Sequence, residues 1–423
     1  MGYLEESQLE QTYVMGTYAR KPVELVSGRG MEVTDAEGRT YLDFVAGVGA
    51  VSLGHCHPAV AGALARQAQT LIHVSNYYYI ENRGEVARMI SELLNACATD
   101  GGGVWQSFFA NSGAEANECA IKLARLHARR RAVQKALDAG ASASAAHAAG
   151  EAAPRLIVTL DSSFHGRTLA TLAATAQPAK QEAFQPLPAG FVRAPFNDVD
   201  ALTDLFASRG DEICAVMVEC VQGESGVHPC TEEFLQAARR LTEQWGALLM
   251  CDEVQCGIYR CGTHPFGFQH FGIMPDIVTI AKGVASGMPT GLCAARDHVA
   301  ASFGPGDHGS TFGGSCLAIA AMKATLETLS SEDIASRVER VGAYLKERLA
   351  ELPGVTDIRG LGLMVAADLA EGLDAPTVVA RGLEEGLLLN YTGPQTLRFL
   401  PPLVCMEADV DVLVDRLARL LRA

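Results

Sequence analysis

The amino-acid sequence predicts an α/β protein in which a mainly parallel central sheet lies between helices. Short runs of β-branched and apolar residues alternate with longer amphipathic stretches, as expected when crossover helices connect parallel strands. Each run ends in polar or glycine-rich sequence, and the ligand of an open α/β sheet lies outside the carboxyl ends of the strands. The expected strands are Val104–Phe109, Leu156–Leu160, Ile213–Glu219, Ala247–Cys251 and Ile277–Ala281.

The chain is expected to divide into three parts, because its 423 residues exceed the roughly 100–200 residues of a usual domain. Residues 1–70 hold a hairpin-like pair of runs and should pack with a small C-terminal α+β domain, residues 311–423. Residues 71–310 form the large domain, and their alanine-rich stretch 126–154 is interpreted as a surface insertion that starts helical and then loses regular structure. The runs behind this division are Met31–Thr34, Thr40–Phe44, Ala318–Leu329, Ile334–Leu352, Gly362–Asp368 and Thr396–Phe399.

The composition argues against several classes of protein. A formal net charge of −15 does not suit nucleic-acid binding, which depends on clustered Lys and Arg. No apolar run approaches the ~18–20 residues of a membrane span, and the acidic segment Met1–Glu10 does not resemble a secretory signal. The twelve scattered cysteines suit reduced thiols, so a cytoplasmic protein is expected.

One cluster of cysteines, Cys251, Cys256 and Cys261, raises the question of a metal site. Their spacing does not match the CxxC pairs of zinc sites, and Cys251 continues an apolar run. We therefore interpret them as small buried hydrophobic residues and expect no metal.

Three strand ends carry residues that suggest one ligand. Ser112 and Gly113 stand between Val104–Phe109 and a helical pattern, where a helix N-terminus favours an anion such as phosphate. Lys282 directly follows Ile277–Ala281, and burial there would lower its pKa, as a Schiff-base nucleophile requires. Asp252 ends another run, where a carboxylate could hold a pyridinium N–H.

Each of these signals has an ordinary explanation when taken alone. Ser112 and Gly113 could belong to an ordinary capped helix. Lys282 could be a surface lysine in a turn, and Asp252 could simply cap a turn. Together, however, they supply a phosphate seat, a carbonyl-binding amine and a partner for a ring nitrogen. A protein needs these three groups to bind pyridoxal phosphate, so the combination favours this cofactor.

Ordered motifs over nearly the whole chain resemble one known family. They are Tyr18–Val23, Tyr41–Phe44, Leu53–Pro58, His73–Asn76, Asn111–Glu118, Phe164–Thr168, Gln222–Glu224, Asp252–Gln255, Lys282, His308–Gly314 and Leu397–Pro402. They resemble the class III aminotransferases of fold type I, and most closely the acetylornithine aminotransferases. The resemblance implies a pyridoxal 5'-phosphate-dependent transaminase that works as a homodimer with shared active sites.

The resemblance also implies a role for individual residues around the cofactor. Lys282 would hold the cofactor covalently and shuttle a proton, and Asp252 would pair with the ring nitrogen. Thr311 would reach the phosphate of the neighbouring subunit's cofactor. The remaining cofactor contacts implied are Ser112, Gly113 and Ala114 at the phosphate, and Phe164, His165, Val254 and Gln255 around the ring.

Four further residues are implied at the substrate. Arg398 would clamp an α-carboxylate, and Arg167 a second, more distant carboxylate such as that of 2-oxoglutarate. Glu224 would act as a gate that pairs with Arg398 for an amine donor and releases it for glutamate. Tyr18 belongs to a segment, Tyr18-Ala19-Arg20, that resembles the acetylornithine aminotransferases. Surface ion pairs worth ~0–1 kcal/mol are the ordinary alternative for these charges.

The expected reaction moves the terminal amino group of N2-acetylornithine to 2-oxoglutarate, as in arginine biosynthesis. Ornithine aminotransferases resemble the same pattern but carry a tyrosine where this chain has Val48, and valine offers no hydrogen bond to a free α-amino group. Succinyldiaminopimelate, ornithine and 4-aminobutyrate remain alternative donors. A mutase, racemase or decarboxylase on the same scaffold is a further alternative. The chain departs from the family pattern at Cys220, Ser225, Cys256, Tyr259, Cys261, Ser315 and Cys316.

Overall fold

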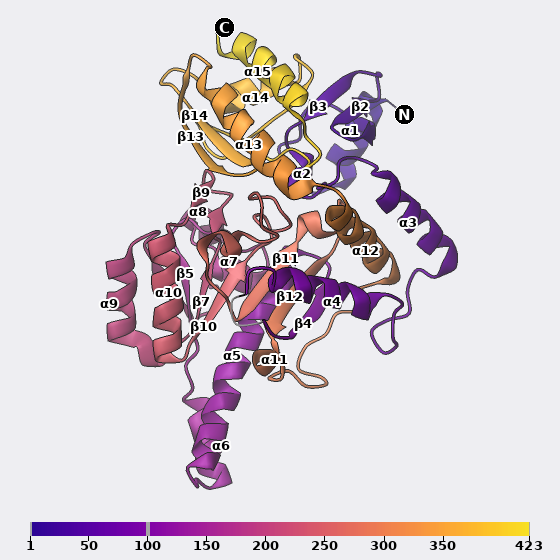
Figure 1. Cartoon of the computed structure of the whole chain (residues 1–423). Helices are drawn as coiled ribbons and strands as arrows, with labels where there is room; N and C mark the ends of the chain where they lie inside the picture. Colours follow the sequence, from indigo (N-terminus) through magenta and orange to yellow (C-terminus); the bar gives the residue numbers. More distant parts are fainter. Residues whose placement is uncertain (1, 99–101, 423) are drawn as a thin grey trace.

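A computed structural model describes residues 2–98 and 102–422, and it confirms the mainly parallel sheet (Figure 1). Along the sheet the strands are β4 (Trp105–Ala110), β12 (Gly291–Arg296), β11 (Ile277–Ala281), β10 (Leu248–Asp252), β7 (Ile213–Val218), β5 (Leu156–Leu160) and β6 (Phe191–Ala194). In this sheet β12 runs antiparallel to β4 and β11, whereas the other paired strands are parallel. The carboxyl ends of β4, β11, β10, β7 and β5 therefore meet at one edge.

The two faces of the sheet are covered by different helices, since successive side chains of a strand point to opposite faces. Residues such as Ile157, Met217 and Ile277 form one apolar cluster with α5 (Gly113–Asp138). Their strand neighbours, such as Val158 and Val216, join a larger cluster with α4 (Arg83–Leu94), α9 (Val199–Arg209) and α10 (Glu232–Trp245). Both faces are apolar, which explains why the strands read as continuous hydrophobic runs.

The alanine-rich stretch is more regular than the sequence indicated. The helix α5 continues to Asp138, and a second helix, α6 (Ala143–Glu151), folds back against it, so the expectation of lost regular structure was wrong. Ser142 caps α6, and Ala146 and Gly150 are buried. Small residues thus allow two helices to approach closely. Figure 1 shows this pair projecting from the body of the molecule.

A second, antiparallel sheet lies in the C-terminal part. Its strand order is β13 (Val355–Leu361), β14 (Met364–Leu369), β17 (Thr396–Phe399) and β16 (Asn390–Tyr391). The helices that follow residue 311 are α12 (Cys316–Ser331), α13 (Ile334–Ala350), α14 (Ala375–Gly382) and α15 (Glu407–Leu421). In Figure 1, α13, α14 and α15 lie with this sheet at the top of the molecule.

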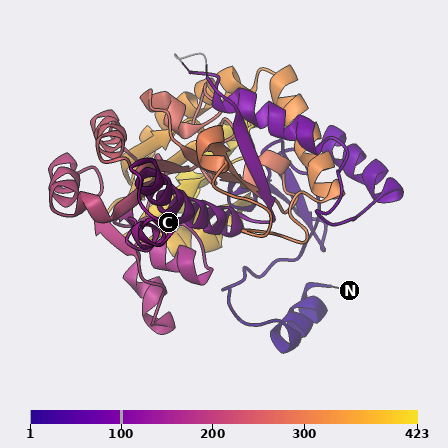
Figure 2. The same cartoon turned by 90° about the horizontal axis from the view of Figure 1, so that it is seen from below.

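The N-terminal part joins the C-terminal part through a small sheet. Its strand order is β1 (Leu25–Arg29), β2 (Glu32–Asp35), β3 (Thr40–Asp43) and β15 (Leu387–Leu388), in which β3 and β15 pair in parallel. The helix α1 (Tyr3–Tyr13) has no buried residue, and Figure 2 shows it standing apart from the body. The division into three parts at residues 70 and 310 stays a prediction.

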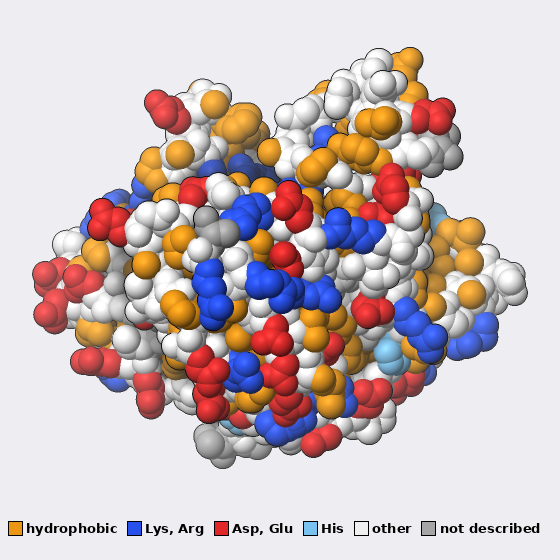
Figure 3. Space-filling view, turned by 90° about the horizontal axis from the view of Figure 1, so that it is seen from above, with side chains coloured by type: hydrophobic (Ala, Val, Ile, Leu, Met, Phe, Trp, Pro, Cys, Tyr) orange, Lys and Arg blue, Asp and Glu red, His pale blue; other side chains and the backbone are white. Residues whose placement is uncertain are grey.

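The remaining elements are short connections or flanking helices. They are α2 (Ala46–Gly49), α3 (Pro58–Thr70), α7 (Leu169–Ala174), α8 (Pro178–Gln181), α11 (Asp297–Ala300), β8 (Val221–Gln222) and β9 (His228–Pro229). Among the described residues, no helix is long and apolar enough to cross a membrane. Acidic and basic side chains are intermingled on the face shown in Figure 3.

The twelve cysteines are all free thiols, and their burial is uneven. Cys56 is exposed and Cys97 is half-buried, whereas the other ten are buried. Cys251, Cys256 and Cys261 are each 1–2% exposed, which confirms that they are packed inside the protein.

Candidate active site

A cavity of about 360 Å³ opens where the strand ends meet. It brings together residues that are far apart in the sequence. The sequence-predicted residues that line it are Ser112, Gly113, Ala114, Phe164, His165, Arg167, Glu224, Asp252, Val254, Gln255 and Lys282. The structure therefore places most of the predicted site residues around one space.

Lys282 stands at the end of β11 in an unusual backbone conformation. Its φ of 49° lies in the left-handed region, which costs a residue with a side chain about 1 kcal/mol or more. Burial lowers the pKa of Lys282, while the carboxylates of Glu224 and Asp252 act in the opposite direction. A neutral amine is thus more accessible at Lys282 than at an exposed lysine.

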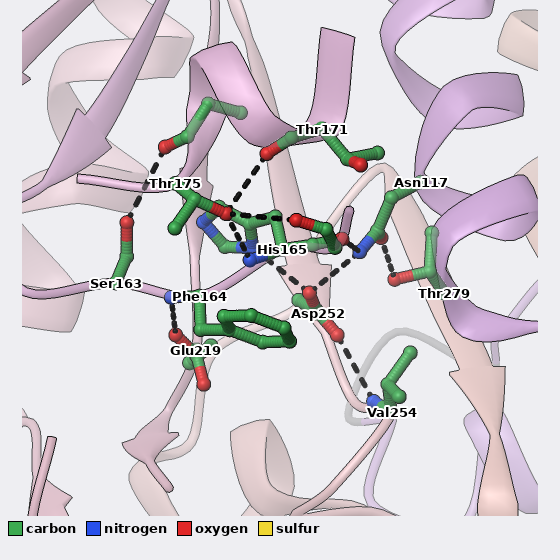
Figure 4. A network of polar contacts seen from close by, with 12 residues as sticks. Asn117, Ser163, Phe164, His165, Thr171, Thr175, Glu219, Asp252, Val254 and Thr279 are labelled. Carbon is green, nitrogen blue, oxygen red and sulfur yellow. Dashed lines mark hydrogen bonds and ion pairs between the residues drawn. The ribbon is translucent and has the colours of Figure 1, made fainter. Parts of the chain in front are cut away.

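Asp252, the last residue of β10, is held by three donors (Figure 4). Its Oδ2 accepts from Asn117 Nδ2 at 2.8 Å and lies 2.8 Å from Nδ1 of His165, while Oδ1 accepts from the backbone N–H of Val254 at 3.1 Å. Asp252 is only 4% exposed. Because a buried charge needs partners, these contacts are what keep the carboxylate in place.

His165 is a titratable partner of Asp252. Burial alone would lower the pKa of His165, but the hydrogen bond to Asp252 and the nearby Asp252 and Glu219 carboxylates raise it. The neighbouring carboxylates therefore oppose the loss of a proton from this buried imidazole. Its Nε2 is buried without a hydrogen-bond partner in the described part of the chain.

Asn117 and Thr279 belong to this network, although no role was predicted for either. Asn117 Nδ2 also donates to the carbonyl of His165 at 2.7 Å, and its Oδ1 accepts from Thr279 Oγ1 at 2.6 Å. Thr279 is the one hydroxyl residue in the otherwise apolar strand β11. That hydroxyl was a signal available in the sequence.

Ser112 and Gly113 form the start of α5, which confirms the expected N-cap. The Ser112 hydroxyl accepts from the Glu115 N–H at 3.2 Å, and the Glu115 carboxylate accepts from the Asn111 N–H at 2.6 Å. A Cβ on Gly113 would lie 2.7 Å from Cγ1 of Val254. Glycine therefore lets the helix N-terminus and Val254 approach each other, and this N-terminus faces the cavity with its partial positive charge.

Arg398, which is buried, and Glu224, which is half-buried, form an ion pair beside the cavity. Arg398 Nη1 donates to Glu224 Oε1 at 2.6 Å and to the carbonyl of Gly223 at 2.9 Å. Arg398 is 3% exposed. Burial alone would raise the pKa of Glu224, but Arg398 outweighs it and lowers the pKa to about 2. Gln255 completes the group, since its Nε2 donates to Glu224 Oε1 at 3.3 Å.

Two cations lie against the ring of Phe164. The Arg167 guanidinium carbon is 5.7 Å from the ring centroid, and Lys180 Nζ is 5.3 Å from it. Burial lowers the pKa of Lys180, and Arg167 and Arg398 act in the same direction. No sequence motif indicated Lys180, which lies on the four-residue helix α8.

Three predicted residues do not line this cavity: Arg398, which lies beside it, and Tyr18 and Thr311, which lie farther away. Tyr18 is 77% exposed and borders a larger cavity of about 920 Å³ between α1 and the C-terminal part. Thr311 is exposed on the loop before α12. Its predicted partner is the cofactor of a second subunit, and this role stays a prediction.

Comparisons with known proteins agree with this geometry. The family model described as aminotransferase class-III matches residues 15–421. The chain is 44% identical to an acetylornithine aminotransferase of Caldanaerobacter subterraneus over 95% of each chain. It is 41% identical to an acetylornithine aminotransferase of Methanocaldococcus jannaschii over 97% of this chain and 96% of that protein.

Solved structures show the same fold. The ornithine aminotransferase of Toxoplasma gondii superposes with a TM-score of 0.87 at 29% identity, covering 100% of this chain and 95% of that one. The acetylornithine aminotransferase of Elizabethkingia anophelis gives 0.82 at 30% identity, covering 100% and 99%.

This chain belongs to the class III aminotransferase family. It has the fold type I architecture and is a pyridoxal phosphate-dependent transaminase.

Proposed function

We propose that this transaminase moves the terminal amino group of N2-acetylornithine to 2-oxoglutarate, giving N-acetylglutamate 5-semialdehyde and glutamate. The observation that carries the proposal is the Arg398–Glu224 pair beside Lys282, because it can offer a substrate either a neutralised or a free guanidinium. The relatives named acetylornithine aminotransferase support the choice of donor. We place the reaction in arginine biosynthesis and in the cytoplasm.

The cavity residues fit pyridoxal phosphate. The glycine at the start of α5 lets Val254 pack closely against the helix N-terminus, and this N-terminus lines the cavity and suits a phosphate. Asp252 is a fixed carboxylate, and Lys282 is an amine of lowered pKa. When bound, the cofactor supplies an electron-withdrawing ring that stabilises negative charge on the substrate carbon.

Lys282 is proposed to hold the cofactor and to move the proton. Its lowered pKa leaves more of the amine neutral, which is the form that accepts a proton from a substrate carbon. The backbone at Lys282 and the polar network around Asp252 fix both groups on the ends of adjacent strands. Such fixed placement removes much of the entropy cost of bringing reacting groups together.

Glu224 and Arg398 are proposed to alternate between the two substrates. When N2-acetylornithine presents its terminal amine, the closed pair leaves no free cation beside the reacting carbon. When glutamate or 2-oxoglutarate enters, Arg398 releases Glu224 and binds the α-carboxylate, and Arg167 binds the distal one. One site then serves two different ligands in turn, as a ping-pong exchange requires.

Val48 is proposed to favour an acylated donor. It is partly buried, has a left-handed φ of 61°, and packs against an apolar cluster that includes Val221 and Leu400. Val221 precedes the Gly223–Glu224 segment, and Leu400 follows Arg398. An apolar side chain there offers no partner for a free α-amino group, which disfavours ornithine.

A homodimer is proposed from an apolar surface next to Thr311. Two segments meet there, because Asn76 Nδ2 donates to the carbonyl of Ser310 at 2.7 Å and to that of Gly313 at 3.1 Å. Large exposed side chains cover both segments: Leu71, Ile72, Tyr77, Tyr78, Tyr79 and Phe312. A patch of this kind commonly marks an interface, and a second copy would bring Thr311 to the neighbouring site.

Absorbance spectra test the chemistry and the donor together. The protein with bound cofactor should show a visible band that N2-acetylornithine bleaches without any keto acid, in the wild type and not in Lys282→Ala. If only ornithine or 4-aminobutyrate bleaches the band, the proposed donor is wrong. A protein that takes up no cofactor would contradict the whole proposal.

Mixing two inactive variants tests the shared site. Lys282→Ala removes the amine from one site, and Thr311→Glu should repel the phosphate of the partner's cofactor. Because a mixed dimer carries both defects at one site and neither at the other, co-refolded variants should regain up to half of the wild-type activity per dimer. No recovery, or a monomer by light scattering, would contradict the dimer.

A further inference from the structure

Glu219 is a buried carboxylate that follows β7 and lines the active-site cavity. It is 6% exposed and has no role in the reaction described so far. A buried carboxylate is costly unless it is hydrogen-bonded, so its partners indicate what it does. Both of its hydrogen-bonding partners are backbone groups of segments that carry functional side chains.

The two oxygens of Glu219 join two loops. Its Oε1 accepts from the N–H of Phe164 at 2.8 Å, as Figure 4 shows, and its Oε2 accepts from the N–H of Gly223 at 3.4 Å. Phe164 lies on the loop after β5, and Gly223 follows β8. The carboxylate therefore ties the loop with the aromatic ring to the segment that carries Glu224.

Gly223 is in turn an anchor of Arg398. Its N–H is held by Glu219, and its carbonyl, which belongs to the next peptide unit, accepts from Arg398 Nη1 at 2.9 Å. A Cβ at Gly223 would collide with Oε1 of Gln255, so the backbone of this residue fits tightly against the rest of the gate. A displacement of the Gly223 backbone would therefore move an acceptor of Arg398 and the adjacent Glu224.

We propose that Glu219 is a positioning residue that holds the backbone of Gly223, and through it the Arg398–Glu224 pair, in the closed arrangement that the amine donor requires. This inference rests on the proposed function, since it assigns Glu219 to the alternation between N2-acetylornithine and glutamate. Glu219 acts through Gly223 and touches neither substrate. Its loss should therefore affect the two half-reactions unequally.

The protonation of Glu219 as the pH falls provides a second test of the proposal. Burial raises the pKa of Glu219 to about 7, with His165 acting against this rise and Asp252 adding to it. A protonated carboxyl accepts the two N–H groups less strongly, so the gate should loosen as the pH falls below about 7. Glu219 interacts electrostatically with these charged and titratable groups: His165, Asp252, Lys180, Lys282 and Cys230.

Glu219→Gln is the informative variant, and Glu253→Gln is its matched control. The amide keeps the size of the side chain but turns an N–H toward one of the two backbone donors. Glu253 also follows its strand directly, is 1% exposed and accepts two backbone N–H groups, from Gly267 and Phe268, each at 2.8 Å. Burial raises its pKa to about 7 as well, yet it does not line the cavity.

Each half-reaction is followed by rapid mixing of the cofactor-loaded enzyme with N2-acetylornithine or with glutamate alone. In Glu219→Gln we expect the acetylornithine half-reaction to slow about tenfold and the glutamate half-reaction to change less than about threefold, as for one weakened buried hydrogen bond. Glu253→Gln should leave the ratio of the two rates unchanged. Equal slowing of both half-reactions in Glu219→Gln would overturn the proposal.

The pH dependence of the two half-reaction rates in the wild type provides a test that does not require the Glu219→Gln variant to fold. The ratio of the acetylornithine rate to the glutamate rate should fall as the pH drops through about 7, and Glu219→Gln should lose this dependence. A constant wild-type ratio from about pH 6 to 8 would overturn the inference about Glu219. If the wild type does not react with N2-acetylornithine at all, the proposed function fails instead, which is a distinguishable result.

Discussion

Removing the Glu224 carboxylate should change which substrate the enzyme prefers. The pKa of Glu224 falls from an ordinary 4.5 to about 2. At 1.36 kcal/mol per pKa unit this net shift corresponds to about 3 kcal/mol, the amount by which the attraction of Arg398 and Lys282 exceeds the cost of burial. Because the Glu224 side chain is 26% exposed, solvent screening reduces the figure to about 2–3 kcal/mol. In Glu224→Ala that energy no longer holds Arg398 in the closed pair.

The expected result is a shift of about 30- to 150-fold in the ratio of kcat/KM for N2-acetylornithine to kcat/KM for glutamate, in favour of glutamate. The two half-reactions are measured separately by the loss of the visible band. Glu224→Gln, which keeps an oxygen for Arg398 but no charge, should lie between the wild type and Glu224→Ala.

The control for Glu224→Ala is Glu385→Ala, which breaks a surface pair with Arg419 at 2.7 Å and should leave the ratio unchanged. Thermal unfolding is measured in parallel, because an unpaired buried arginine destabilises the fold. A ratio within about threefold of the wild type, in a folded Glu224→Ala protein with its band intact, would refute the reasoning.

Other changes have separate expected outcomes. Lys282→Ala should lower kcat by about 10³-fold or more, and activity above one-tenth of wild type would contradict its role. Gly113→Ala should weaken cofactor binding about 10- to 100-fold in a titration, because its Cβ would meet Val254 at 2.7 Å. Gly150→Leu should loosen α6, since a Cβ there would lie 2.7 Å from Val133, and speed hydrogen exchange in α6 while kcat stays within about twofold. Because burial raises the pKa of Glu253 to about 7, the native protein retains a proton that the unfolded chain releases, so stability should decrease between about pH 4.5 and 7. The free energy of unfolding, measured with urea, should depend less on pH in Glu253→Gln than in the wild type. An unchanged dependence on pH would contradict the raised pKa of Glu253.

Much of the site could be predicted because its residues follow strands. Ser112, Asp252 and Lys282 each stand at the end of an apolar run, and the structure brings them to one cavity. Their positions depend on local sequence and on the rule that parallel strands share a carboxyl edge. The resemblance to a family added Glu224 and Arg398, whose pairing no local pattern indicates.

The residues that were missed depend on packing between distant segments. Asn117 and Thr279 are separated by most of the large domain and meet only because α5 lies against β11. Strand β12 has no β-branched residue, and β6 has only four residues, so neither gave a strand signal. The helix α6 was missed because alanine, serine and glycine resemble a linker, whereas here they allow close helix packing.

Because the thiols differ in burial, the rate at which each one reacts can show when the structure around it opens. In the native protein a maleimide should reach Cys56 readily and Cys97 more slowly, whereas the ten buried thiols should react only when the surrounding structure opens. Cys405 lies in the C-terminal part, and Cys119 and Cys214 lie on α5 and β7. Peptide-level mass spectrometry of the labelled thiols would therefore time the opening of the two regions separately, without any engineered cysteine.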